Sequence, residues 1–189
     1  MKILVFDNYD SFTYNLVHYL EKVNENASIE IHRNDKINLR EIEPFDKILL
    51  SPGPGLPKDA GILKDVIKTY APSKSILGIC LGQQAIAEVY GGTLRNLQEV
   101  FHGVATPVNV VKSDVLFKGL PETFNVGRYH SWVVNNADLP VELEVTCTDG
   151  VGNIMGLRHK TYDVRGVQFH PESVLTEFGL EMIGNWVNM

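Results

Sequence analysis

Strand-like runs alternate with segments of helical periodicity through the first half of the chain, and this alternation limits the fold more than any other feature of the sequence. The strand-like runs cover residues 2–7, 28–33, 46–50 and 75–79. Apolar residues recur at helical spacing in the segments that follow them, residues 12–23, 59–71 and 82–92. This order predicts an α/β fold with a doubly wound, mostly parallel central sheet flanked by helices.

The second half of the chain has a different pattern. From about residue 100 it contains short β-rich segments, at residues 104–111, 124–134, 141–148, 154–159 and 163–170. A final helix is predicted around Phe178, Met182, Ile183 and Trp186. Because no linker, charge run or repeat separates the halves, we expect one domain over residues 1–189 with an additional small antiparallel β part.

Size, charge and cysteine content exclude several classes of protein. A net charge of −6 over 189 residues, with scattered lysines and arginines, argues against nucleic acid as a partner. The apolar run before Asp7 is too short for a signal peptide or membrane span, so we expect a cytoplasmic protein with no membrane partner. Cys80 and Cys147 form no C-x-x-C pair and are expected to be reduced thiols.

Cys80 follows a predicted strand and precedes a predicted helix, where open α/β sheets form ligand crevices. The spacing Gly78-x-Cys80-x-Gly82 is the cysteine counterpart of a nucleophile elbow, in which glycines permit a sharp turn. A helix N-terminus also lowers a thiol pKa, and the next amide, of Leu81, is free to donate to an oxyanion. The alternative is a small buried residue, since free cysteines are often buried.

A second group of candidate residues lies in GVQFHPES, residues 166–173. Pro171 favours an extended conformation for His170, so the side chains of His170 and Glu172 leave from the same face. A carboxylate beside an imidazole fixes its tautomer and stabilises the imidazolium that forms when the ring accepts a thiol proton. Cys80, His170 and Glu172 together therefore supply a nucleophile, a base and an orienting group.

Two further features lie near the same predicted edge of the sheet. SPGPG, residues 51–55, follows a strand expected beside the one that ends at Cys80, and the Gly55 amide is a candidate second oxyanion donor. A plain Pro-Gly turn is the alternative. Gln84 lies one helical turn after Cys80 and can hydrogen-bond the molecule that Cys80 attacks, or it is a solvated helix residue.

Three motifs, SPGPG at 51–55, GICLGQQ at 78–84 and GVQFHPE at 166–172, resemble those of the class I (triad) glutamine amidotransferases in order and separation. The resemblance extends over essentially the whole chain. FDNYDSFTYNL at 6–16, FHG at 101–103 and GRYHSWVV at 127–134 narrow it to the glutaminase subunits of anthranilate synthase (component II) and aminodeoxychorismate synthase. The resemblance implies the flavodoxin-like fold of that family.

The resemblance also implies a role for each matching position. Cys80 would be the nucleophile, His170 the general base and acid, and Glu172 its orienting carboxylate. The amides of Gly55 and Leu81 would hold the oxyanion. The pocket for L-glutamine would be lined by Gly53, Pro54, Gly55, Gln84, Ser131 and Trp132.

By the same resemblance the subunit needs no cofactor, and no cysteine or histidine spacing suggests a metal. Ammonia would pass to a chorismate-binding component I synthase that makes anthranilate for tryptophan or 4-amino-4-deoxychorismate for folate. Phe12, Tyr14 and Trp132 are candidates for that interface, or else core aromatics. The chain departs from the commonest family pattern at Gln83, Val104 and Trp132, where histidine, lysine and leucine are frequent.

Two other classes of protein remain open at this point. A cysteine hydrolase or peptidase, or a DJ-1-like protein, also places an elbow cysteine on an α/β sheet, although DJ-1-like proteins usually have histidine where Leu81 stands. A flavodoxin-like binding module without enzymatic activity would keep the sheet while Cys80 and His170 lay apart. The distance between these two side chains discriminates among the classes.

Overall fold

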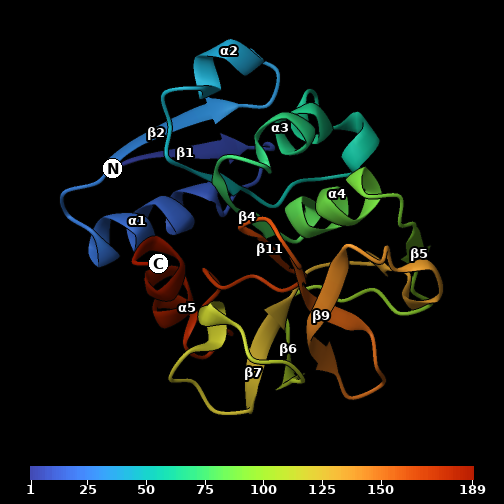
Figure 1. Ribbon diagram of the computed structural model, residues 1–189. Coiled ribbons are helices and arrows are strands. Elements are labelled where there is room, and N and C mark those ends of the chain that lie inside the picture. The colour runs from blue at the N-terminus through green and yellow to red at the C-terminus, as the bar shows by residue number, and fades with distance from the viewer.

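The computed structural model describes residues 1–189, and a nine-stranded sheet crosses the whole molecule (Figure 1). Its strand order is β2-β1-β3-β4-β11-β10-β9-β6-β7. The parallel part consists of β2 (Ser28–Arg33), β1 (Lys2–Asp7), β3 (Lys47–Leu50), β4 (Ser75–Ile79) and β11 (Val164–Val167). The antiparallel part consists of β10 (Ile154–His159), β9 (Leu143–Asp149), β6 (Val104–Val110) and β7 (Thr123–Arg128).

The expected α/β fold is confirmed, and the antiparallel strands prove to continue the central sheet. Strand β11 pairs in parallel with β4 on one side and antiparallel with β10 on the other, so one strand joins the two parts. A separate two-stranded antiparallel sheet is formed by β5 (Leu94–Asn96) and β8 (Trp132–Val134).

Helices cover both faces of the parallel part of the sheet (Figure 1). Side chains alternate along β1, so Leu4 and Phe6 pack into one apolar core while Ile3 and Val5 pack into the other. The first core includes α3 (Leu63–Tyr70) and α4 (Leu81–Val89). The second includes α1 (Thr13–Val23) and α5 (Gly179–Val187). Covering on both faces explains why β1 reads as a continuous apolar run.

Several boundaries differ from the expectations. The helix expected over 59–71 divides into a 3₁₀ turn at Pro57–Asp59 and α3, because Gly61 has φ +55° and its backbone lies against Asn34. The segment 124–134 divides between β7 and β8, which belong to different sheets. Phe178 precedes α5 in a left-handed conformation.

Two short elements were missed by the sequence reading, namely α2 (Leu39–Ile42) and β5. A signal for α2 is present, because Asn38 and Glu41 have the spacing of a capping box and form one. Strand β5 has three residues, too few for a periodic pattern to identify. The remaining 3₁₀ turns are Val115–Phe117 and Asn136–Asp138.

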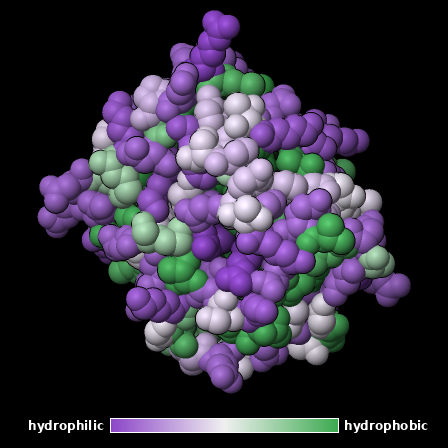
Figure 2. Space-filling model, viewed as in Figure 1, coloured by the Kyte–Doolittle hydropathy of each residue, from purple (hydrophilic) through white to green (hydrophobic).

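The molecular surface in the view of Figure 1 is mainly hydrophilic, and apolar residues form small separate groups on it (Figure 2). None of the helices combines the length and apolar content that crossing a bilayer requires.

Helix α4 approaches the sheet closely at its first turn. A Cβ atom on Gly78 would lie 2.5 Å from the carbonyl carbon of Gly82, and one on Gly82 would lie 2.8 Å from the Leu50 oxygen. Both distances are shorter than nonbonded contact allows, so both positions require glycine. This approach sets Cys80, which lies between the two glycines, at the carboxyl edge of the parallel strands.

We expect Gly78→Ala to lower the free energy of unfolding by about 2 kcal/mol, because the new methyl group meets backbone atoms that cannot rotate away. Urea denaturation measures the change. Gly150→Ala is the matched control, since a Cβ there meets no atom within 4 Å. Equal loss of stability in the two variants would contradict the role assigned to this contact.

Candidate active site

Cys80 lies at the turn between β4 and α4 in a strained backbone conformation. Its φ and ψ are +50° and −97°, a region that non-glycine residues seldom occupy. The Cys80 N–H donates to the Val167 carbonyl at 2.7 Å, and the Cys80 carbonyl accepts from the Gln84 N–H at 3.1 Å. The residue is 7% exposed. This is the sharp turn that the Gly-x-Cys-x-Gly spacing predicts.

His170 and Glu172 form the contact expected from their spacing. Nδ1 of His170 lies 2.7 Å from Oε1 of Glu172, and both side chains are buried. Nε2 of His170 has no hydrogen-bond partner in the protein. Because Glu172 occupies Nδ1, the second ring nitrogen is left for proton exchange.

The imidazole of His170 lies beside the Cys80 thiol. Burial alone would lower the pKa of His170, but its interactions with the Cys80 thiol and with the Glu172 carboxylate raise its pKa to about 10. Phe12 and Tyr129 pack on the ring, with centroid separations of 6.0 and 4.9 Å. The three expected side chains therefore meet, and the arrangement of a binding module, in which Cys80 and His170 lie apart, is not the one observed.

The sheet topology explains why these segments meet. Strands β3, β4 and β11 are adjacent and parallel, with Leu50 paired to Gly78 and Gly78 paired to Gly166. Their carboxyl ends therefore reach the same edge of the sheet, where open α/β sheets bind ligands. The SPGPG turn, Cys80 and the segment leading to His170 each follow one of these ends.

A cavity of about 180 Å³ opens beside the Cys80 thiol. All six residues expected to bind substrate line it, and so do Tyr129 and His130; the full lining is Gly53, Pro54, Gly55, Cys80, Gln84, Tyr129, His130, Ser131 and Trp132. Leu81 is not part of the lining, but it begins α4, where amide N–H groups have no intrahelical acceptor. The Gly55 N–H has no hydrogen-bond acceptor in the protein, and Gly55 has φ +74°.

Gln84 has a more restricted role than its helical position indicates. Its Nε2 donates to the Trp132 carbonyl at 3.0 Å and to Oε1 of Gln168 at 3.2 Å. Both N–H groups of the amide are therefore used inside the protein, and only its oxygen remains to accept a hydrogen bond from a bound molecule.

His130 is a buried, neutral histidine in the wall of this cavity. Arg128 Nε donates to its Nε2 at 3.1 Å, so its Nδ1 carries the proton and donates to the Trp132 carbonyl at 3.0 Å. Burial and the neighbouring Arg128 charge lower the pKa of His130 to about 3. Arg128 is held by a buried ion pair with Asp149 at 3.0 Å. These contacts hold the backbone of Ser131 and Trp132 in place.

The sequence reading missed Gln168, Tyr129 and His130 as residues of the site. Gln168 is fully buried and donates to the Cys80 sulfur at 3.4 Å. A signal for it was available, because a polar residue within the apolar run Val167-Gln168-Phe169 is unusual in a buried segment. Tyr129 and His130 lie within the GRYHSWVV stretch, but no local pattern distinguishes them as residues that line a cavity.

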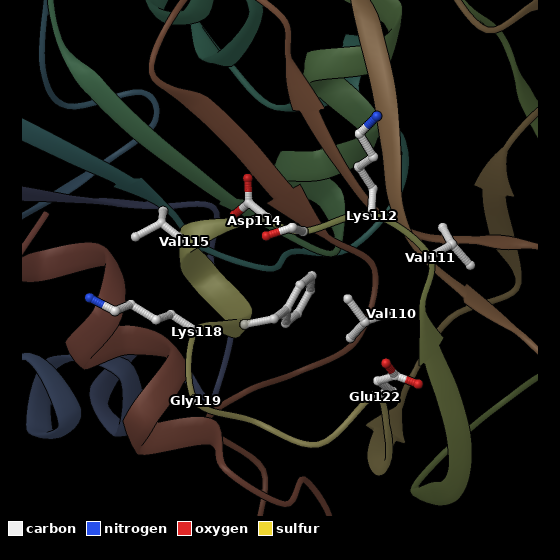
Figure 3. A pocket seen from close by; sticks show the side chains of 10 residues that line it. Val110, Val111, Lys112, Asp114, Val115, Lys118, Gly119 and Glu122 are labelled. Carbon is white, nitrogen blue, oxygen red and sulfur yellow. The ribbon is translucent and has the colours of Figure 1, made fainter.

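Larger hollows lie elsewhere on the surface, and Figure 3 shows one of about 680 Å³ between β6 and the Val115–Phe117 turn. Its buried carboxylate, Asp114, is already paired with Arg158 and Arg165. The amines of Lys112 and Lys118 point away from each other (Figure 3). This hollow therefore lacks a free buried reactive group. No three His, Cys, Asp or Glu side chains in the molecule are grouped so that they would hold a metal ion.

The neutral His130 leads to a prediction about pH. The unfolded chain takes up a proton on this imidazole as the pH falls through about 6.5, whereas the folded chain does so only near pH 3. The associated stability is thus present above pH 6.5 and is lost as the pH falls toward 3. We expect His130→Gln to reduce the slope of unfolding free energy against pH between 6.5 and 4 by up to about 1.4 kcal/mol per pH unit.

Urea denaturation at a series of pH values measures this slope. His18→Gln, which replaces an exposed histidine of α1, is the matched control for losing an imidazole. If the His130→Gln protein keeps the slope of the unmodified chain, His130 is not held neutral by its surroundings.

Comparison with known proteins places this geometry in a family. The family model for class-I glutamine amidotransferases matches residues 4–189. The chain is 44% identical to anthranilate synthase component 2 of Pseudomonas aeruginosa, covering 98% of this chain and 94% of that protein. It is 43% identical to aminodeoxychorismate synthase component 2 of Escherichia coli, covering 98% of this chain and 99% of that protein.

Some relatives are much longer than this chain. The chain is 44% identical to the bifunctional protein TrpGD of Thermotoga maritima and covers 32% of its length. It covers 25% of a multifunctional tryptophan biosynthesis protein of Phycomyces blakesleeanus, with 47% identity.

A solved structure from Thermoplasma acidophilum, named for a GMP synthase, aligns with a TM-score of 0.89 at 28% identity, over 100% of this chain and 92% of that one. A glutamine amidotransferase structure from Thermotoga maritima shares the fold, with a TM-score of 0.77 at 18% identity over 100% of this chain and 81% of that one. Because the family model covers nearly the whole chain and full-length relatives share more than 40% of its residues, this chain belongs to the class-I glutamine amidotransferase family.

Proposed function

We propose that this chain hydrolyses L-glutamine to glutamate and delivers the ammonia to a chorismate-binding synthase. The single observation that carries the proposal is the meeting of Cys80, His170 and Glu172 beside a small cavity. A thiol beside a carboxylate-oriented imidazole is the arrangement required for nucleophilic attack on an amide. Family membership identifies that amide as the side chain of glutamine.

In the first half of the reaction, His170 holds the proton of Cys80 and the thiolate attacks the side-chain amide carbon of glutamine. A carbon–sulfur bond forms, and the carbonyl π electrons move to the oxygen. The amides of Gly55 and Leu81 stabilise that oxyanion, since the first has no acceptor in the protein and the second begins α4. His170 then gives its proton to the leaving nitrogen, the carbon–nitrogen bond breaks, and ammonia leaves a thioester.

In the second half, water attacks the thioester carbon and gives a proton to His170. The carbon–sulfur bond breaks, the sulfur regains its electron pair, and glutamate is released. Glu172 keeps the imidazole oriented throughout, as its 2.7 Å contact with Nδ1 supports. Both halves use only protein groups and water, so we propose that the subunit needs no cofactor.

The substrate pocket is proposed to consist of Gly53, Pro54, Gly55, Gln84, Ser131 and Trp132, because all six line the cavity beside Cys80. A Cβ on Gly53 would lie 2.6 Å from Asn8, so glycine at this position lets the turn pack against the end of β1. Gln84 would accept a hydrogen bond from glutamine through its free oxygen.

The partner is proposed from the relatives and from the chemistry of ammonia. Ammonia released into water is protonated and ceases to be a nucleophile, so it has to reach its acceptor directly. Component 2 proteins named for anthranilate synthase and for aminodeoxychorismate synthase match this chain about equally, at 44% and 43% identity. We therefore propose that chorismate is the acceptor of the ammonia. Product analysis of the reconstituted complex would show whether anthranilate or 4-amino-4-deoxychorismate is made. A reduced catalytic thiol favours a cytosolic location, and both cysteines are free.

We expect Cys80→Ser to abolish glutamine-dependent product formation by the complex with its chorismate-binding synthase, because Cys80 is the only thiol that lines the cavity. Added ammonium salt should still support synthesis, because the synthase reaction does not use this thiol. Product formation is followed by fluorescence or chromatography.

The same experiment includes a chemical control. A glutamine-like electrophile should label the unmodified chain at Cys80, as peptide mapping by mass spectrometry would show. Labelling at another residue, or loss of both the glutamine and the ammonium reactions in Cys80→Ser, would count against the proposed role of Cys80.

An exposed apolar rim beside the triad is the proposed docking surface for the synthase. We use the name apolar rim for Tyr14, Val100, Val104 and Val174, of which Tyr14 is 71% and Val174 97% exposed. Val174 follows Ser173, whose hydroxyl lies 3.1 Å from the Tyr129 hydroxyl, and Val104 pairs with Arg128. Tyr14 lies two residues after Phe12, which packs on His170, and Val100 directly precedes Phe101, which packs on His130. Exposed apolar side chains near a catalytic site are typical of an interaction surface.

The three aromatic residues expected at the interface differ in exposure. Tyr14 is exposed and belongs to the apolar rim. Phe12 is partly buried and packs on Tyr129 and His170, so its contacts support the active site. Trp132 is partly buried and lines the cavity.

We expect Val174→Asp to weaken binding of the synthase about tenfold, because a carboxylate at this exposed position would have to be desolvated in the complex. Titration calorimetry or biolayer interferometry measures the affinity. Val141→Asp is the matched control, because Val141 is 79% exposed and lies far from the triad. It precedes β9 near the amino ends of the parallel strands, whereas Cys80 follows the carboxyl end of β4. Unchanged affinity in Val174→Asp would remove this residue from the interface.

A further inference from the structure

Gln168 contacts the reactive sulfur, and the mechanism above gives it no role. It follows β11 and is fully buried between the sheet and α4. Its Nε2 lies 3.4 Å from Sγ of Cys80, within the range of an N–H···S hydrogen bond. A buried polar side chain of this kind is costly unless it is hydrogen-bonded, so its placement against the thiol needs a reason.

The orientation of the Gln168 amide is determined by its neighbours. Gln84 Nε2 donates one N–H to the Trp132 carbonyl and the other to Oε1 of Gln168. The oxygen of Gln168 must therefore face Gln84, and its NH₂ group must face Cys80. The opposite orientation would set NH₂ against NH₂ at Gln84 and an oxygen lone pair against the sulfur.

We propose that Gln168 is a catalytic residue that donates an N–H to the Cys80 sulfur and stabilises its thiolate. This inference rests on the proposed function, in which that thiolate is the nucleophile. The hydrogen bond from Gln84 to the Gln168 oxygen polarises the second amide and strengthens the N–H that reaches the sulfur. The chain of contacts from the Trp132 carbonyl through Gln84 to Gln168 thus joins the substrate cavity to the nucleophile.

The surroundings of the sulfur show why a second donor is useful. Cys80 is 7% exposed, so its sulfur has little contact with water. His170 is the one charged group beside the sulfur, and Glu172 lies behind it. The Asp10 carboxylate and the neutral His130 ring are further neighbours of His170. His170 must also give its proton to the leaving nitrogen. After that transfer, Gln168 is the remaining donor to the sulfur.

The proposed donor acts in both halves of the reaction. It holds the thiolate lone pairs so that one of them points toward the cavity for attack on the amide carbon. When water has added to the thioester and the carbon–sulfur bond breaks, the electron pair returns to sulfur, and the Gln168 N–H donates a hydrogen bond to the sulfur as its negative charge develops.

The pH dependence of Cys80 alkylation tests the proposal without any need for glutaminase activity. Iodoacetamide reacts with the thiolate, so the midpoint of its rate against pH reports thiolate formation in the full chain. Cys147 does not interfere, because burial raises the pKa of its thiol to about 12. We expect Gln168→Met to shift the midpoint upward by about one pH unit and to slow alkylation about tenfold at pH values below the midpoint. Gln168→Glu, which sets a carboxylate beside the sulfur, should shift it further.

Gln83→Met is the matched control. Gln83 is also a buried glutamine, and it lies in the first turn of α4, but its side chain approaches the Ile154 carbonyl and not the sulfur. The midpoint of the alkylation rate against pH should be the same in the Gln83→Met protein as in the unmodified chain. An unchanged midpoint in Gln168→Met, or a shift of the same size in Gln83→Met, would overturn the proposal. If the midpoints shift as expected but the unmodified chain with its synthase does not hydrolyse glutamine, the proposed function fails and the role of Gln168 toward the sulfur does not.

A measurement on the unmodified chain covers the case in which the Gln168 variants do not fold. The side-chain ¹⁵N–¹H signal of Gln168 should move downfield over the same pH range in which Cys80 becomes reactive, and it should not do so in Cys80→Ala. If the chemical shift of this signal does not change over that pH range, the proposal is overturned independently of any Gln168 variant.

Discussion

The close packing of the first turn of α4 onto β3 and β4 is the contact on which the rest of the site depends. Gly78 and Gly82 allow backbone to meet backbone there, and the chain between them has to reverse within one residue. Cys80 takes up that reversal with φ +50°, a conformation that surrounding hydrogen bonds hold in place. The thiol consequently stands at the carboxyl edge of the sheet, beside the start of a helix and opposite the segment that carries His170.

Around this thiol the protein arranges neutral dipoles more often than charges. The Trp132 carbonyl accepts hydrogen bonds from both His130 and Gln84, so the cavity wall is held from two sides. Gln84 in turn orients Gln168. Such a network is already aligned before glutamine enters, and prealigned donors lower the cost of stabilising charge during the reaction. The buried ion pair between Arg128 and Asp149 acts one contact further away, through His130.

The two buried histidines of the site show how surroundings decide protonation. Both rings are almost fully buried, and burial favours the neutral form of each. His170 faces a carboxylate and a thiol, and its pKa rises to about 10. His130 faces the guanidinium of Arg128, and its pKa falls to about 3. One histidine is therefore suited to carry a proton, and the other serves as a fixed hydrogen-bond donor.

The sequence by itself determined the α/β class, the turn at Cys80 and the pairing of His170 with Glu172, because these depend on residue periodicity and on steric effects between near neighbours. The tertiary structure decided that the antiparallel strands continue the main sheet, that Phe12 packs on the imidazole, and that Gln168 and His130 belong to the site. These contacts depend on which strands are adjacent and in what register they pair. Local patterns do not contain that information, since the energy of a strand pair comes from residues far apart in the chain.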